Sequence, residues 1–185
     1  DLSAFYFDIR KDNLYCEDKD SIKRKSIIKV LNIILNSLLK WFAPILSFTT
    51  EEIYKLLLKD KKSIHLEKFL EIPKKFQNEK LNDKWTELIK IRDICNISIE
   101  EKRASKEIGS SLEADLKINL NQKLEKITNN IDFSELCITS KAEVVYKDGI
   151  ETSAITIKAE GQKCSTCWKI KESACDRNNC AMKLE

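Results

Sequence analysis

The stretch SIKRKSIIKVLNIILNSLLKWFAPILSFTTEEIYKLLL, residues Ser21 to Leu58, decides the fold of this chain. Its apolar residues recur at steps of three and four, which is the spacing of one face of an α-helix. The stripe contains Ile27, Leu31, Ile34, Leu38 and Trp41, and it is widened by Ile28, Leu35, Leu39 and Phe42. The opposite edge is narrow and polar, so we expect a mostly buried helix with several helical neighbours.

A second helix is expected directly after the first. Pro44 ends the first helix because proline has no backbone N–H and disfavours a helical residue before it. Thr49 with Glu52 three residues later forms a capping-box pattern, and Phe48 precedes the cap where it could pack on Ile53. The pattern predicts helix, proline corner and helix, which is the start of an α-helical bundle.

Composition bounds the class of protein. The chain has 185 residues, 42% apolar and 34% charged, which is typical of a soluble globular protein of one or two domains. The longest unbroken apolar run, Trp41 to Leu46, is far shorter than the roughly 20 residues that span a bilayer, and no secretory leader is apparent. We therefore expect no membrane contact and a cytoplasmic location. The net charge of +3 is too small to establish a polyanionic partner by itself.

A third long helix is predicted from Asn78 to Lys106. Its apolar positions step by three or four through Leu81, Trp85, Leu88, Ile91, Cys95 and Ile99, and Gly109 follows the charged end as a stop. We expect this helix to close the bundle against the first two. The fold class is thus mainly α, with a helical-bundle domain over residues 1–108.

The apolar period changes after Gly109. Leu116, Ile118 and Leu120 alternate with polar residues as in a half-buried strand, and a helical segment with Leu124, Ile127 and Ile131 follows. Further short strands are predicted at Leu136–Ile138, Val144–Tyr146 and Ile155–Ile157, the last two joined as a hairpin through Asp148 and Gly149. Residues 109–160 are therefore predicted to be a small α+β module.

Four of the seven cysteines are concentrated near the end of the chain. Cys164 and Cys167 have two residues between them, and Cys175 and Cys180 have four, whereas Cys16, Cys95 and Cys137 are scattered. Two close thiolate pairs can bind one Zn²⁺ tetrahedrally and order a segment that has little apolar core. Residues 161–185 are thus a predicted zinc-binding tip, and four cysteine ligands make the metal structural.

These cysteines and the residues around them allow other interpretations. A redox dithiol would normally open a helix in a thioredoxin-like unit, which the sequence lacks, and a pair of disulfides does not suit a reducing cytoplasm. The basic and aromatic residues near the cysteines, Lys163, Trp168, Lys169 and Arg177, could stack on a base and pair with phosphate, or could be a packing lid.

Catalytic patterns are absent from the sequence. There is no glycine-rich phosphate loop, no Ser, His and Asp set and no convincing carboxylate pair, and the single histidine, His65, has no companion ligand or nucleophile near it. We expect this chain to catalyse nothing by itself.

Several motifs taken together resemble the C-terminal part of bacterial isoleucyl-tRNA synthetases, which are class I aminoacyl-tRNA synthetases. They are DLSAFYFDIRKDNLYC from Asp1, APILSFTTEEIY from Ala43, SIHLEKF from Ser63, KEIGSSLEA from Lys106, and the terminal cysteine pairs. The resemblance covers nearly the whole chain. The APILSFTTEEIY motif also resembles valyl and leucyl enzymes, so the equivalent region of one of these is an alternative.

The resemblance implies the end of a helical anticodon-binding domain, a junction module and a zinc-binding tip that approaches the anticodon loop. The partners it implies are isoleucine tRNA and the catalytic body of the same polypeptide, which uses ATP and Mg²⁺; the catalytic and editing domains are not in this chain, which we expect to be monomeric. Carried over by residue, the zinc ligands are Cys164, Cys167, Cys175 and Cys180. The second pair is spaced more openly than in the family.

Three hypotheses for the function follow. The first is a tRNA-binding fragment whose Lys and Arg contacts to phosphate make binding weaken with salt. The second is a structural module that braces the catalytic body and binds little RNA of its own. The third is a redox or zinc-storage protein based on the four thiols, which requires reversible disulfide formation within each pair.

Overall fold

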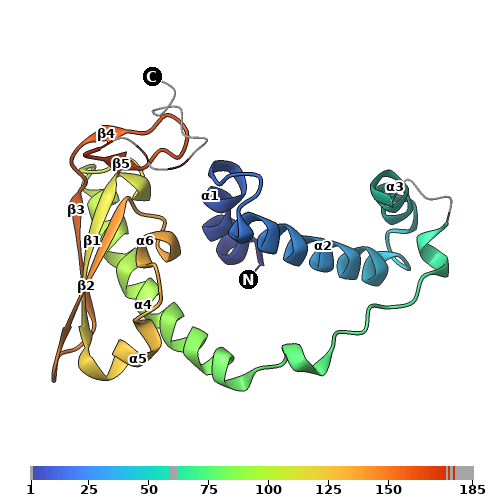
Figure 1. Ribbon diagram of the computed structural model, residues 1–185, viewed down its shortest axis with the longest axis horizontal. Helices are drawn as coiled ribbons and strands as arrows, with labels where there is room; N and C mark the ends of the chain where they lie inside the picture. Colours follow the sequence, from blue (N-terminus) through green and yellow to red (C-terminus); the bar gives the residue numbers. More distant parts are fainter. Residues whose placement is uncertain (1, 59–61, 174, 176, 178–185) are drawn as a thin grey trace. The chain divides into compact units, whose positions relative to one another are not determined.

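The structure is a computed structural model, and it describes residues 2–58, 62–173, 175 and 177 (Figure 1). Contacts between Cα atoms divide the chain into two compact units. The first combines Asp1–Asp18 with Asn78–Glu185, and the second is Lys19–Gln77. Each unit is described separately below.

The unit Lys19–Gln77 contains the two helices predicted from the opening stretch. They are α2 (Ile22–Phe42) and α3 (Ser47–Leu58), followed by the short 3₁₀ helices η2 (Ile64–Leu66) and η3 (Lys74–Phe76). A small core of Leu39, Ala43, Tyr54 and Ile64 joins α2, α3 and η2. The predicted stripe on α2 is less buried than expected, since Leu38 is half-buried and Trp41 is 51% exposed. The described part of this unit is too small to cover the whole stripe.

The corner between α2 and α3 differs from the prediction in where the second helix begins. The carbonyl of Leu46 accepts both the backbone N–H and the hydroxyl of Thr50, at 3.0 Å and 2.9 Å, so the helix begins before Thr49. Thr49 is therefore inside the first turn, and the predicted cap there is wrong. Phe48 is 92% exposed and makes no staple with Ile53. The corner itself, directly after Phe42, is where Pro44 predicts it.

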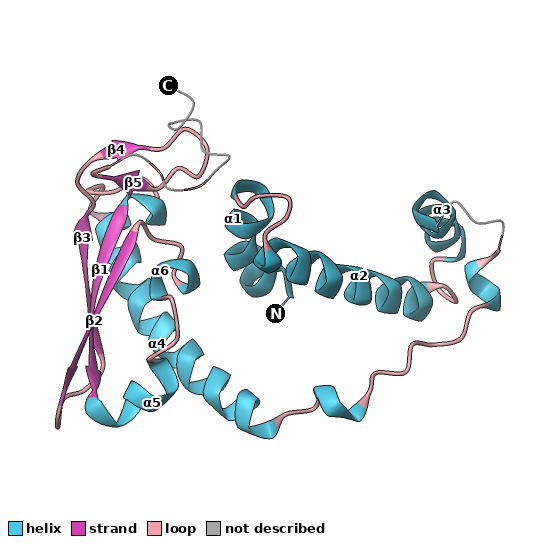
Figure 2. Cartoon of the chain, in the orientation of Figure 1, coloured by secondary structure: helices cyan, strands magenta, loops and turns pink. Residues whose placement is uncertain are grey.

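A three-stranded sheet forms one layer of the other unit, with the long helix α4 (Glu79–Ala104) beside it (Figure 2). Its strands are β1 (Ala114–Asn121), β2 (Lys141–Lys147) and β3 (Ser153–Lys158), in the order β2-β1-β3. Strand β1 pairs parallel to β2 and antiparallel to β3, so Ile118 lies between Val144 and Ala154. The alternation of Leu116, Ile118 and Leu120 is confirmed, because all three are buried.

The predicted hairpin between the second and third strands is wrong. Strands β2 and β3 lie on opposite sides of β1, so the turn at Asp148 and Gly149 does not pair them. The sequence predicts a tight turn correctly, since Gly149 has φ of +70°, but a turn does not determine which strands become neighbours.

Short helices form the crossover from β1 to β2. After the 3₁₀ turn η5 (Gln122–Leu124) come α5 (Glu125–Thr128) and α6 (Phe133–Leu136). The strand predicted at Leu136–Ile138 is wrong because Asp132 caps α6: its carboxylate accepts the N–H groups of Ser134 and Glu135 at 2.9 Å and 3.2 Å. Phe133 and Leu136, three residues apart, are buried on one face of that helix.

The long helix α4 (Glu79–Ala104) is confirmed, and its buried residues Leu88, Ile91, Cys95 and Ile99 belong to the predicted stripe. Asn78 caps it by accepting the N–H of Leu81 at 3.0 Å. The stripe packs with the apolar side chains of β1 in one core cluster, and Ser98 accepts the Thr156 N–H at 3.0 Å. The expectation that this stripe closes a bundle with residues 21–58 is therefore wrong. An apolar stripe predicts burial but not the element that covers it.

The first segment of the chain joins this same unit. A π-helical turn, η1 (Leu2–Phe7), leads into α1 (Asp8–Cys16), and the 3₁₀ turn η4 (Ser111–Glu113) precedes β1. The ring of Phe5 meets Trp85 of α4 edge to face at 6.1 Å, and Ile9 enters the core cluster with the sheet. Phe5 thus packs on α4.

The observed folds agree with an α-rich chain that carries a small α+β module. The division into residues 1–108, 109–160 and 161–185 stays a prediction. In the part of the chain that is described, no helix is long and apolar enough to cross a membrane.

Candidate metal centre

A short β-hairpin carries the first cysteine pair. Its strands β4 (Gln162–Lys163) and β5 (Ile170–Lys171) pair antiparallel, with Gln162 opposite Lys171. Within the loop, the Trp168 N–H donates to the Cys164 carbonyl at 3.0 Å, and the Cys164 N–H donates to the Lys169 carbonyl at 2.9 Å. The loop therefore turns Cys164 and Cys167 toward the same side.

Three of the four predicted zinc ligands come together. Cys164, Cys167 and Cys175 are buried, and their sulfur atoms all lie within 4.8 Å of one another. Thiolates around one tetrahedral Zn²⁺ with bonds of about 2.3 Å lie about 3.8 Å apart, so this spacing is close to what zinc requires. Cys180, the fourth predicted ligand, lies outside the described residues.

The surroundings of the sulfur atoms suit thiolate ligands. The backbone N–H groups of Thr166 and Cys167 point at the Cys164 sulfur at 3.4 Å and 3.5 Å, and Lys171 Nζ is 3.5 Å from the Cys175 sulfur. Such donors stabilise negative sulfur. Burial, together with the neighbouring sulfur groups, raises the pKa of Cys167 to about 12. A divalent cation would compensate this cost, so the donor set fits a metal.

A cysteine that sequence reasoning left unassigned packs against this group. Cys16, at the end of α1, is buried in one cluster with Cys164, Cys167 and Cys175, and its thiol donates to the Thr166 carbonyl at 3.6 Å. Burial raises the pKa of Cys16 to about 11, so it stays a neutral thiol near pH 7. Cys16 and Thr166 are 150 residues apart in sequence, so no local sequence pattern indicates that they are in contact.

An ion pair also joins the tip to α1. Both terminal nitrogens of Arg177 donate to the carboxylate of Asp12, at 2.6 Å and 2.5 Å. Burial alone would raise the pKa of Asp12, but the hydrogen bonds and charge of Arg177 hold it below its ordinary value. Arg177, predicted as an RNA contact, is thus already engaged within the protein.

The other predicted RNA contacts lie in different environments. Trp168 is 60% exposed and has a left-handed backbone with φ of +61°. Lys163 is exposed, and its ammonium is 3.5 Å from a Glu113 oxygen. Lys169 is only 9% exposed, and its ammonium lies 3.4 Å from the Ser134 hydroxyl. Trp168 therefore offers the most open surface of the four, and their contact with RNA stays a prediction.

Comparison with known proteins identifies the family. The family model described as "Anticodon-binding domain of tRNA ligase" matches residues 1–131. The chain is 65% identical over 97% of its length to the isoleucine–tRNA ligase of Pelagibacter ubique, and 39% identical over 92% to that of Agrobacterium fabrum. It is 42% identical over 91% to the isoleucine–tRNA ligase of Fervidobacterium nodosum. The chain spans about a fifth of the length of these relatives. It belongs to the family of anticodon-binding domains of tRNA ligases.

Proposed function

We propose that this chain is the tRNA-binding, C-terminal region of an isoleucine–tRNA ligase, an enzyme that attaches isoleucine to its tRNA using ATP. The observation that carries this proposal is the family match over residues 1–131 together with 65% identity to an isoleucine–tRNA ligase. The similarity continues through the α+β module and the cysteine tip, since it covers 97% of the chain. A valyl or leucyl enzyme is not favoured by these relatives.

The metal in this proposal has a structural role. Zn²⁺ would be held by Cys164, Cys167, Cys175 and Cys180, with no ligand position left for substrate. The two-residue strands β4 and β5 bury little apolar surface, so a metal would supply much of the stability of the tip. ATP, Mg²⁺ and the chemistry of aminoacylation belong to other parts of a longer, cytoplasmic polypeptide, which we take to be a monomer.

The experiment is a titration of the zinc-loaded chain with isoleucine tRNA and with the same tRNA carrying an exchanged anticodon. Weaker binding to the exchanged tRNA is expected, and the affinity should fall as salt rises because phosphate contacts release counterions. Equal affinity for both tRNAs would show that the chain contacts the RNA backbone but does not distinguish the anticodon. An affinity that does not change with the salt concentration would contradict the proposal.

A bracing role without RNA binding is the second candidate, and the charge pairing favours it. Arg177 is paired with Asp12, Arg10 with Glu135, and Lys163 lies near Glu113. Cations that are already neutralised within the protein contribute less to the attraction of RNA phosphates. Footprinting of tRNA on the full-length enzyme, with no protection that depends on this region, would support bracing over binding.

A further inference from the structure

A fourth buried cysteine, Cys16 of α1, lies against the three sulfur atoms of the candidate metal centre. Cys16 is only 6% exposed and belongs to one cluster with Cys164, Cys167 and Cys175. Its sulfur is not within 4.8 Å of all three, as they are of one another. Tetrahedral zinc takes four ligands. The described part of the chain therefore brings three ligands together and places one further thiol beside them.

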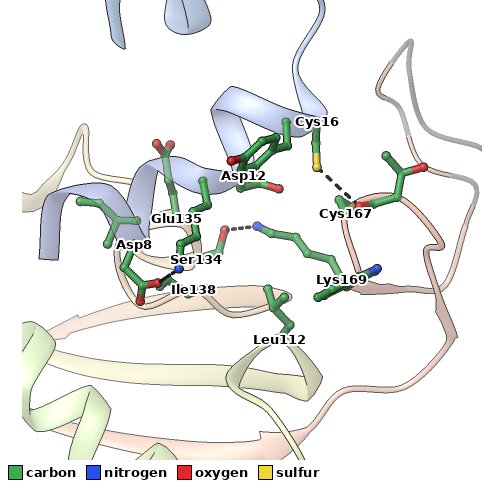
Figure 3. Close-up of a pocket in the computed structure, with 14 residues that line it drawn as sticks. Asp8, Asp12, Cys16, Leu112, Ser134, Glu135, Ile138, Cys167 and Lys169 are labelled. Atoms are coloured by element: carbon green, nitrogen blue, oxygen red, sulfur yellow. Dashed lines mark hydrogen bonds and ion pairs between the residues drawn. The ribbon is translucent and has the colours of Figure 1, made fainter. Parts of the chain in front are cut away.

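The Cys16 side chain is directed at the loop that holds two of these ligands. Its thiol donates to the carbonyl of Thr166 at 3.6 Å, and Thr166 lies between Cys164 and Cys167 in sequence. Figure 3 shows the Cys16 sulfur on the side of α1 that faces this loop. A thiol is a weak hydrogen-bond donor, so this contact does little to hold the sulfur away from a metal.

A mainly apolar cavity of about 470 Å³ gives the Cys16 sulfur room to move. Cys16 and Cys167 both line this cavity, and both belong to the unit of Asp1–Asp18 and Asn78–Glu185. A change between staggered rotamers about the Cα–Cβ bond moves a cysteine sulfur without moving its backbone. The sulfur can therefore turn within the cavity while α1 stays in place.

Helix α1 is already attached to the tip next to the metal centre. Asp12 lies one helical turn before Cys16. Its carboxylate accepts both terminal nitrogens of Arg177 at 2.6 Å and 2.5 Å, and Arg177 follows Cys175 by two residues. Further along α1, Ile9 is buried in the core cluster with the sheet. A ligand from this helix comes from chain that is already ordered, so its binding loses little conformational entropy.

We propose that Cys16 is a further ligand of the metal, and that it exchanges with Cys180 at the fourth coordination position. The inference rests on the metal centre of the proposed function and adds a ligand from α1 to it. In the exchange, the bond from the metal to the Cys180 sulfur breaks and one to the Cys16 sulfur forms. The Cys16 proton passes through water to the Cys180 thiolate, so the number of ligands and the charge do not change.

The exchange is confined to this one position. Backbone hydrogen bonds of the hairpin loop hold Cys164, and the N–H of Cys167 donates to the Cys164 sulfur, so the loop fixes this pair. When Cys16 supplies the fourth ligand, the metal joins α1 directly to the tip.

The test uses the chain loaded with Co²⁺, which replaces Zn²⁺ in thiolate sites and absorbs in the near ultraviolet in proportion to the sulfur atoms bound. Cys180→Ser and Cys16→Ser alone should each keep the absorption of the parent chain, because the other thiol takes the fourth position. The double variant should lose about a quarter of it, since three of four sulfur ligands remain. Its affinity for Co²⁺ should fall at least 10- to 100-fold, about the effect of losing even an outer partner of a metal ligand.

Cys137→Ser in the Cys180→Ser background is the matched control. Cys137 is equally buried in the same unit but belongs to the core cluster with the sheet, outside the cysteine cluster. This variant should keep the full absorption. Cys16→Ala repeats the test without burying a new hydroxyl, and the thermal melt of every variant shows that the core is folded.

A loss of about a quarter of the absorption in Cys180→Ser, with no further change when Cys16 is also replaced, would overturn ligation by Cys16 and leave the metal centre intact. Full absorption in the double variant would overturn it as well. A parent chain that binds no Co²⁺ would overturn both this inference and the metal centre of the proposed function.

Discussion

Replacing Gly161 by alanine should disrupt the metal tip more than the same replacement at Gly109 or Gly149. Gly161 lies directly before β4 with φ of +125°, a conformation that side chains rarely adopt. An added Cβ would lie 2.3 Å from the Lys171 carbonyl oxygen and 2.9 Å from the Glu172 nitrogen. Both are backbone atoms of the paired strand region, so no flexible side chain can move aside.

The cost has two parts. Holding a residue other than glycine at such a φ costs about 1–3 kcal/mol. Relieving the contact requires a shift of β5 by roughly 1 Å, which would break hydrogen bonds worth about 1 kcal/mol each in a hairpin of only two residue pairs. The sum is about 3–5 kcal/mol. In the proposed zinc tip, metal binding and folding would be one equilibrium. Because about 1.4 kcal/mol corresponds to a tenfold change, the affinity for zinc should then fall by about 100-fold or more.

Gly149 provides a matched control because it also has a positive φ, +70°, but nothing lies within 4 Å of an added Cβ. Gly149→Ala should destabilise the unit by the conformational cost alone and leave zinc affinity unchanged. The assay is competition for zinc between each variant and a coloured chelator. Gly161→Ala holding zinc within about threefold of the parent chain would refute the reasoning.

Three further results are expected. Cys167→Ser should abolish zinc binding while the thermal melt of the core around Leu116 persists, and loss of that melt would show that tip and core are not separable. Leu116→Ala, at a fully buried site, should lower the free energy of unfolding by about 2–5 kcal/mol, and half-buried Leu38→Ala by less, both measured by denaturant titration. Lys55 and the Ile64 amide lower the pKa of Glu51 to about 2, below its ordinary 4.5. Hydrogen-exchange protection of the Ile64 amide should therefore be complete above about pH 4.5 and be lost as the pH falls toward 2. In Glu51→Gln this protection should not depend on pH over that range.

Local patterns predicted the elements well where one physical cause dominated. The stripe of α4 and the alternation of β1 depend only on which side chains avoid water. The alternation is buried as predicted, and so is the stripe from Leu88 to Ile99, whereas Leu81 at its start is 48% exposed. Pro44 and Gly149 mark turns because of their backbone chemistry.

The partners of α4 and the neighbours of β2 were wrongly predicted because they depend on distant parts of the chain. The errors at Thr49 and at Leu136–Ile138 were local, since hydrogen bonds of Leu46 and Asp132 decide those helix starts.

The candidate metal site was predictable because cysteine spacing can be read within one short segment. Its surroundings were not predictable because they depend on residues far apart in the chain. Cysteine spacing is a local signal, and the structure brings Cys164, Cys167 and Cys175 together. The buried contacts of the tip with α1 join residues more than 140 positions apart, namely Cys16 with Thr166 and Asp12 with Arg177. No pattern in either segment alone indicates the other.

This arrangement suggests how a structural metal can serve recognition without touching RNA. Arg177 and Trp168 stand beside predicted zinc ligands, so a metal that fixes Cys167 and Cys175 also limits where those side chains lie. Helix α1, which supplies Tyr15, is joined to the tip through Asp12 and Cys16. Ordering these side chains before binding reduces the entropy lost when RNA binds. A tip without metal should therefore bind RNA more weakly even though each cation keeps its charge.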